Sequence, residues 1–278
     1  MPLRNSTIHS LLVYIFLLEG LMLTFSIPQP APPSAARDSS STNMDYRLFE
    51  FFTIHSSCKS RRAMVARIIS DAFMLAEVGR DIPESSISYK NYFVDPALDQ
   101  NEFYIVRNMS VSILSNGDSK KKTTIRCPRK DIGVIARTTA DPTDDPFIEL
   151  FPKFFQYPSL ASKPFTKNGW CTPPPHDLFN FQVKESFLIH EFTHLAHIAQ
   201  RALELASNQA AERIIALRRV GTIDITHAKG YDHYDIPAQA ARDLKKQWVA
   251  YLTSQAHEVK PSFWPDENGE SYGDALLG

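Results

Sequence analysis

The sequence is poor in cysteine, carries no excess charge and lacks a long apolar run, and each absence excludes a class of protein. Three cysteines cannot build a disulfide-dense scaffold, although they allow one bridge and leave one thiol over. A net charge of −1 argues against a nucleic-acid or acidic-lipid partner. The 278 residues, 43% hydrophobic and 22% charged, are typical of a globular protein and show no internal repeat.

The most apolar stretch lies at the N-terminus and predicts a secretory signal peptide over residues 1–26. Arg4 precedes an apolar region that Glu19 interrupts. This region falls short of the ~20 apolar residues needed to span a bilayer, so no membrane association is expected after cleavage. Residues 27–44 are rich in Pro and Ser and predict a disordered leader. One folded domain is expected over residues 45–278.

The motif that organises this domain is His190-Glu191-Phe192-Thr193-His194, which has the form H-E-x-x-H. On an α-helix, positions i and i+4 lie one turn apart on the same face. Two imidazoles in that relation can bind one Zn²⁺, and the glutamate beside the first histidine can reach a water at the metal. The motif therefore predicts His190 and His194 as zinc ligands and Glu191 as a catalytic base.

The residues around the motif predict that it lies on an amphipathic helix. Apolar side chains recur at spacings of 4, 3, 4 and 3 along one face, namely Leu188, Phe192, Leu195, Ala199 and Ala202. Such a stripe packs a helix against a core and leaves the histidines on another face. We expect residues 187–200 to be helical, and the helix to continue to Arg219 because no Gly or Pro interrupts it.

The rest of the domain predicts an α+β fold with a small twisted sheet. Helical periodicity covers Cys58–Glu77, with Gly79 as the stop, and Ala238–Gln255. Runs of β-formers predict strands at Phe103–Leu114, Thr123–Ile125, Ile132–Arg137 and Phe147–Leu150. The dipeptide Asn116-Gly117 predicts a hairpin between the first two of these strands.

A catalytic zinc usually takes three protein ligands, so the chain has to supply one more. His197 lies seven residues from His190, hence roughly 10 Å along a helix, too far to share one zinc with both motif histidines. The metzincin pattern also fails, because Gln200 stands where that family has its third histidine. The remaining source is the loop after Gly221, which contains the candidates Asp224, His227, Asp232, His233 and Asp235.

From Cys58 to its end, the chain resembles the fungal deuterolysin and lysine-specific metalloendopeptidase family, the aspzincins. The zinc helix is the specific part of this resemblance. Weaker similarity lies in the strand and turn Ile148–Phe155, in Gly230–Asp235 with the helix that follows, and in Glu270-Ser271-Tyr272. The resemblance implies a zincin-like metalloprotease domain and a bridge between Cys58 and Cys127, which match the family's first helix and central strand by position.

The resemblance also implies an aspartate as the third ligand, and we assign it to Asp232. An ungapped match places His233 at that position instead, and Asp235 stays open as well. The family's oxyanion-stabilising tyrosine falls on Ile236 when ungapped, so Tyr234 is the nearest candidate for that role.

The predicted function is that of a secreted, monomeric zinc endopeptidase acting on proteins or peptides. The alternative is a secreted zinc-binding or interaction protein of weak or no activity on the same scaffold. A protein without catalysis has no need of Glu191, which is not a metal ligand, so its presence favours the enzyme. Preference for a particular cleavage site, such as one before lysine, does not follow from the sequence.

Overall fold

The computed structural model describes residues 50–139, 145–162, 182–206, 221–222, 237–254, 260–261, 265, 269 and 271–272. Four short strands in these ranges form one mixed sheet. The strands are β1 (Phe52–Ile54), β2 (Thr123–Arg126), β3 (Ala136–Thr138) and β4 (Phe147–Leu150). They lie in the order β1-β2-β4-β3, with β3 antiparallel to β4 and the other pairs parallel. The strands expected at 123–125 and 147–150 are confirmed. The strand expected at 132–137 is observed at 136–138. The signal peptide and leader expected at 1–44 lie outside the described residues.

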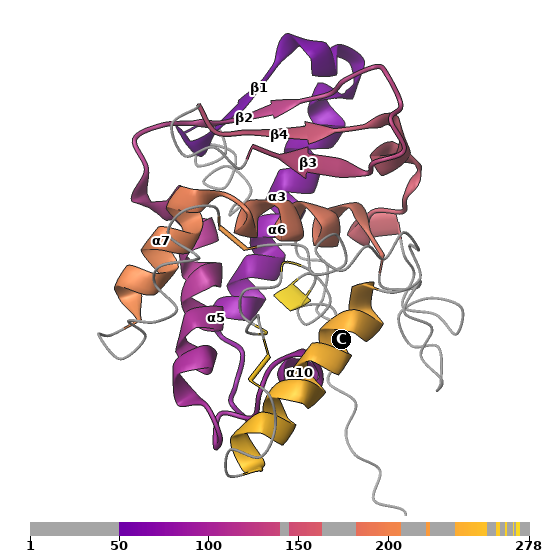
Figure 1. The fold of residues 1–278 in the computed structure, drawn as a ribbon. Helices are drawn as coiled ribbons and strands as arrows, with labels where there is room; N and C mark the ends of the chain where they lie inside the picture. The colour runs from indigo at the N-terminus through magenta and orange to yellow at the C-terminus, as the bar shows by residue number, and fades with distance from the viewer. Residues whose placement is uncertain are drawn as a thin grey trace, which may run out of the picture. The chain divides into compact units, whose positions relative to one another are not determined.

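The described helices all belong to one unit of the chain, Ser41–Gly278 (Figure 1). They are α3 (Arg62–Arg80), α4 (Ile87–Tyr92), α5 (Gln100–Leu114), α6 (Lys184–Thr193), α7 (Ala196–Leu205) and α10 (Pro237–Thr253), with 3-10 turns η1 (Ser56–Arg61), η2 (Asn116–Asp118), η3 (Pro152–Gln156) and η4 (Leu160–Ser162). The helices expected at 58–77 and 238–255 are confirmed with shifted ends. Gly79 lies inside α3 and does not stop it.

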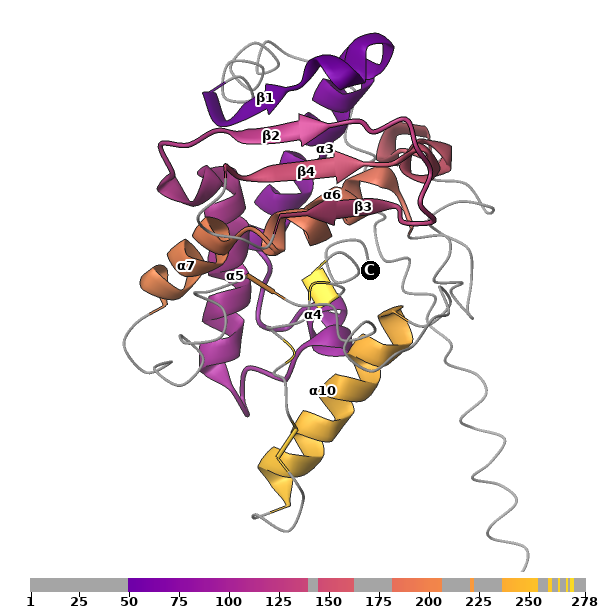
Figure 2. The same cartoon turned by 45° about the horizontal axis from the view of Figure 1, so that its top comes forward.

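One part of the core lies between the sheet and helices α3 and α6, which lie on the same side of the sheet (Figures 1 and 2). Phe52 of β1, Phe73 of α3 and Phe192 of α6 are buried together, with ring centroids 5.3–6.2 Å apart. Burying aromatic side chains of this size stabilises such a junction by roughly 1.5–3 kcal/mol each. Phe192, which lies between His190 and His194 in the motif, therefore fixes helix α6 to the sheet.

The strand predicted at Phe103–Leu114 is wrong, because these residues form helix α5. Asp99 begins the helix, since its Oδ1 accepts hydrogen bonds from the amides of Asn101 and Glu102 at 3.1 Å. The buried apolar side chains recur at helical spacing, namely Phe103, Val106, Met109 and Ile113. This periodicity overrides the high β-propensity of the individual residues.

The hairpin predicted at Asn116-Gly117 is also wrong, because this turn connects helix α5 to strand β2. Asn116, Gly117 and Asp118 all have positive φ, at 49°, 63° and 52°. Asn and Gly tolerate this left-handed conformation, so the dipeptide does mark a turn, but of another kind. A Cβ on Gly117 would lie 2.5 Å from the backbone oxygen of His197, so only glycine allows α7 to approach this closely.

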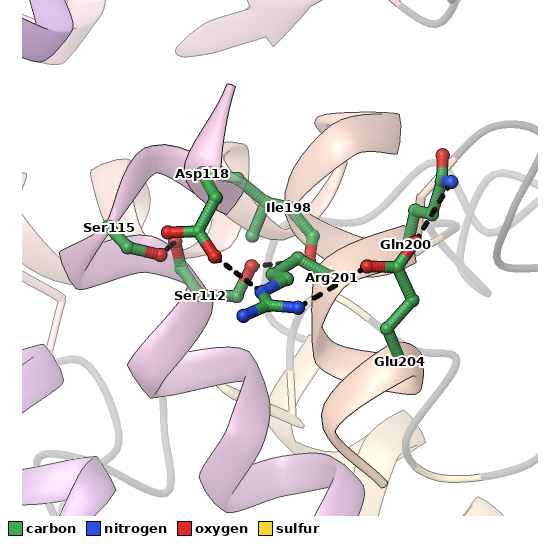
Figure 3. A network of polar contacts seen from close by, with 7 residues as sticks. All are labelled: Ser112, Ser115, Asp118, Ile198, Gln200, Arg201 and Glu204. Atoms are coloured by element: carbon green, nitrogen blue, oxygen red, sulfur yellow. Dashed lines mark hydrogen bonds and ion pairs between the residues drawn. The ribbon is translucent and has the colours of Figure 1, made fainter. Parts of the chain in front are cut away.

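Polar contacts hold α7 against α5 and this turn (Figure 3). Arg201 places its Nε 2.5 Å from Asp118 Oδ2, and it also contacts Glu204 of its own helix at 3.5 Å. Ser112 of α5 donates a hydrogen bond to the backbone oxygen of Ile198 at 2.6 Å. These contacts give α7 its own anchor, separate from the one that holds α6.

The continuous helix predicted from residue 187 to Arg219 is wrong in its length. Helix α6 ends at Thr193, and α7 begins only at Ala196. Leu195 has extended backbone angles, with φ −70° and ψ 115°. The apolar stripe still packs as expected, because all five of its side chains are at most 1% exposed. The predicted helix over 187–200 thus exists as two segments with a bend after His194.

The predicted disulfide between Cys58 and Cys127 is confirmed. It joins η1 to the residue after β2 and closes a loop across a sequence separation of 69 residues. At the other end of the described region, α10 contributes Leu244 and Trp248 to a small cluster with Val94. None of the described helices is long and apolar enough to cross a membrane.

Candidate metal centre

His190 and His194 bring their imidazole rings together at the end of helix α6. Their Nε2 atoms lie 2.9 Å apart, and their ring centroids lie 4.6 Å apart with the planes at 85°. Both side chains are half-buried. Two nitrogen lone pairs at this distance repel unless a proton or a cation lies between them. The structure therefore brings together the two side chains that the sequence predicts as zinc ligands.

The end of α6 is built so that His194 can turn toward His190. The Thr193 hydroxyl donates a hydrogen bond to the backbone oxygen of His190 at 2.7 Å, a contact that competes with regular helical bonding. The amide of Thr222 donates to the backbone oxygen of Thr193 at 3.0 Å. In a continuous helix the amide of His197 would use that oxygen, so the helix ends here.

Gly221 and Thr222 approach the histidines although they are distant in sequence. His194 Nδ1 lies 2.7 Å from the backbone oxygen of Thr222 and 3.1 Å from its hydroxyl. Because a carbonyl oxygen can only accept, Nδ1 carries a proton, and in the neutral ring the lone pair is then on Nε2. Gly221 has φ +73°, and a Cβ there would lie 2.3 Å from the backbone oxygen of His194. Glycine is therefore required at this turn.

Glu191 lies between the two histidines in sequence and is only 6% exposed. Its Oε2 accepts a hydrogen bond from the Thr138 hydroxyl at 2.6 Å, and the same hydroxyl lies 3.0 Å from the backbone oxygen of Glu191. Thr138 is the last residue of β3, the antiparallel edge strand. The carboxylate of the motif is thus attached to the sheet.

Gly269 approaches both rings of the histidine pair. A Cβ on this residue would lie 3.0 Å from His194 Cε1 and 3.2 Å from His190 Cε1. Nearby in sequence, Tyr272 is 2% exposed and packs its ring against Phe93, with the ring centroids 5.2 Å apart. The weak family resemblance at 270–272 predicts no role for this glycine.

His197 does not join the histidine pair. Its Nε2 donates to Asn116 Oδ1 at 3.2 Å, on the side of α7 that faces the left-handed turn. Burial lowers the pKa of His197 to about 4, so the ring is neutral at physiological pH. This placement agrees with its exclusion as a ligand, and it assigns the residue to the packing of α7.

Two buried charged residues begin the motif helix. Glu185 is fully buried and accepts a hydrogen bond from the amide of Leu160 at 2.8 Å, and its burial raises the pKa of its carboxyl. Lys184 donates to the backbone oxygen of Tyr157, and its burial lowers the pKa of its ammonium. They tie the start of α6 to the segment around η4.

The predicted third ligand, Asp232, and its rivals His233 and Asp235 lie outside the described residues, as does the predicted catalytic Tyr234. Across the parts of the chain that the structure covers, no group of three or more His, Cys, Asp or Glu side chains is placed to hold a metal ion. The described centre therefore consists of two imidazoles, one adjacent carboxylate and the backbone and hydroxyl groups around them.

Three contributors to this centre, Thr138, Thr222 and Gly269, do not follow from the sequence pattern. Each reaches the motif across a separation of at least 28 residues, from 194 to 222, and none belongs to a local pattern. Gly221 gives a local signal beside Thr222, but this signal predicts only the end of a helix. The chain matches no model of a known protein family, and no curated protein matches it.

Proposed function

We propose that this chain is a secreted zinc endopeptidase with a zincin-like α+β domain. The observation that carries the proposal is the convergence of His190 and His194 at the end of α6, with Glu191 beside them. In the neutral ring of His194, donation from Nδ1 to the backbone oxygen of Thr222 makes Nε2 the nitrogen that can bind a metal. Histidines that bind metal usually donate their other ring N–H to a carbonyl or carboxylate in this way.

The two imidazoles fit a zinc ion after a small adjustment. Two nitrogens at about 2.1 Å from a tetrahedral zinc lie about 3.4 Å apart. The observed Nε2–Nε2 distance of 2.9 Å requires an increase of only about half an ångström, which small ring rotations provide. The donor set also suits the metal, because neutral imidazole is among its common ligands.

We assign the third ligand to Asp232, with His233 and Asp235 as the rivals. Support comes from Thr222, which contacts His194 and directly precedes, in the sequence, the stretch that contains all three. Asp232 follows ten residues later, and a chain of that length spans up to ~33 Å, far more than a return to the metal requires. A carboxylate oxygen is a competent zinc ligand.

The residues of the chain divide the chemistry between them. Zinc, when bound, would lower the pKa of a water toward ~7 and polarise the scissile carbonyl. Glu191 takes the proton of the attacking water as general base and delivers it to the leaving amine. Tyr234 is our candidate for stabilising the oxyanion. The partial burial of the histidines restricts water around the reacting groups.

Two further features support the proposal. A small mixed sheet with an antiparallel edge strand beside the motif helix agrees in outline with the fold that the aspzincin resemblance implies. A disulfide in a chain with a predicted signal peptide agrees with an oxidising, extracellular destination. We propose a protein or peptide as the substrate, a monomer as the active form, and neither nucleic acid nor membrane as a partner.

The test is casein cleavage by the purified protein, with its zinc content measured on the same sample. We expect about one zinc per chain and activity that a chelator abolishes. Glu191→Gln is the matched control, because it should abolish cleavage and keep the metal, whereas His194→Ala should lose both. Bound zinc without turnover would support the alternative of a zinc-binding or interaction protein. Absence of zinc binding would contradict the peptidase and the zinc-binding protein, and would leave only the interaction protein.

A further inference from the structure

The hydrogen bond between Thr138 and Glu191 joins two elements of different kinds at the candidate centre. The two residues are 53 positions apart, one at the end of edge strand β3 and the other inside helix α6. At 2.6 Å this contact has the length of a strong hydrogen bond from a hydroxyl to an ionised carboxylate. Such bonds are roughly twice as strong as those between neutral groups.

The Thr138 hydroxyl has one proton and can donate it to only one of two nearby oxygens of Glu191 at a time. Oε2 lies at 2.6 Å and the backbone oxygen at 3.0 Å, so the carboxylate is the principal acceptor. Within the described ranges, no side chain or amide donates a hydrogen bond to Oε1. One carboxylate oxygen is thus committed to the strand, and the other keeps its capacity to accept a proton.

We propose that Thr138 is a positioning residue for Glu191, and this inference rests on the proposed peptidase function. A glutamate side chain has three rotatable bonds, and the helix alone does not select one orientation of its carboxylate. The Thr138 hydroxyl selects it by holding Oε2 against β3. General-base catalysis depends on this geometry, because a displacement of about 1 Å can reduce a rate ~100-fold. Thr138 itself does not touch the reacting atoms.

The experiment compares three variants of the full chain with the wild type. Thr138→Val removes the hydroxyl and keeps the shape, Thr138→Ser keeps the hydroxyl, and Thr124→Val is a matched control in strand β2 of the same sheet. A fluorogenic peptide built on a mapped casein cleavage site gives kcat and KM separately. A chromophoric chelator in competition gives the zinc affinity, and thermal unfolding reports the integrity of the fold.

We expect Thr138→Val to lower kcat roughly 10–100-fold while KM, zinc affinity and the unfolding temperature stay close to those of the wild type. Thr138→Ser should restore kcat to within about threefold, and Thr124→Val should behave as the wild type. A crystal structure of Thr138→Val should show the Glu191 carboxylate turned away from its native orientation.

Three results would overturn the inference. Unchanged kcat in Thr138→Val from an active wild type would contradict it alone and leave the peptidase function standing. Loss of zinc or of the fold in Thr138→Val, without rescue by serine, would assign Thr138 a purely structural role. A wild type that binds zinc and cleaves nothing would overturn the proposed function, and the catalytic role of Thr138 with it.

Discussion

Glycine at position 269 is as important to the histidine pair as any side chain around it. The space that its missing Cβ would fill lies 3.0 Å from His194 Cε1 and 3.2 Å from His190 Cε1, closer than ordinary van der Waals contact. Ser271 and Tyr272, which follow two and three residues later, are both buried, so the backbone at Gly269 has little freedom to move away from the rings. The rings can therefore converge only because this residue has no side chain.

Gly269→Ala should weaken zinc binding by roughly tenfold, because the added methyl group displaces at least one imidazole. The affinity is measured by chelator competition, with the thermal unfolding of the metal-free protein as the control for folding. We expect the unfolding temperature to change little. An alanine variant that binds zinc as the wild type does would show that the C-terminal segment can move away at no cost.

At the scale of single residues, the sequence predicted the local part of the centre and missed the rest. The motif predicted that His190 and His194 lie together because positions four apart share one helical face, and their rings do meet. Their roles as zinc ligands, and that of Glu191 as a base, stay predictions. Thr222 could not be found, because its contact depends on how the chain returns after residue 206. The predicted roles of Asp232 and Tyr234 stay predictions, since both lie outside the described residues.

Helix α7 depends on a neutral histidine for its contact with the left-handed turn. His197 donates to Asn116 Oδ1 from a buried position, and its pKa is about 4 instead of the usual 6.5. Above pH ~6.5 the ring is neutral in both the folded and the unfolded state, so pH has no effect through it. Below that pH the unfolded chain takes up a proton that the folded chain refuses until pH ~4. Stability is therefore lost as the pH falls through this window.

His197→Gln should reduce this loss, because the glutamine amide can still donate to Asn116 and does not titrate. Each pH unit within the window costs about 1.4 kcal/mol, so the wild type should lose about 2–3 kcal/mol more than the variant between pH 7 and pH 4.5. Urea unfolding of the metal-free proteins at both pH values measures the difference. Equal losses in the two proteins would mean that His197 titrates normally in the folded state.

At the scale of elements, the errors came from segments that two patterns describe equally well. Residues 103–114 contain many β-formers and also a helical stripe, and the cap at Asp99 decides between them. Residues 187–205 have an unbroken helical pattern, yet Thr222 captures the backbone oxygen of Thr193 and ends α6. Strand β4 was predicted with its observed ends, Phe147 and Leu150, because Pro146 and Pro152 bound the run of β-formers.

A disulfide connects the turn η1 to the residue that follows strand β2. Cys58 and Cys127 are 69 residues apart, and the segment between them contains α3, α4 and α5. A cross-link over a loop of this length removes conformational freedom chiefly from the unfolded chain. Its contribution is therefore to the stability of the whole domain and not to the histidine site in particular.

Replacing both Cys58 and Cys127 by serine should lower the free energy of unfolding by about 2–5 kcal/mol. Denaturant unfolding under non-reducing conditions measures this loss. Cys171→Ser is the control, and we expect it to keep the stability of the wild type, because Cys171 takes no part in the bridge. A large loss in that control would indicate that Cys171 competes for one of the two partners.

The chain leaves the centre at His194 and returns to the same residue at Thr222, so the sequence between them is an excursion with adjacent ends. Its first part, α7, is anchored by Arg201 and Ser112. The second part starts from Ala206, which is buried in the core, and ends at Gly221, which lies against the backbone of His194. The two imidazoles are thus held by contacts at both ends of the excursion, and a change of sequence within it reaches them only through these anchors.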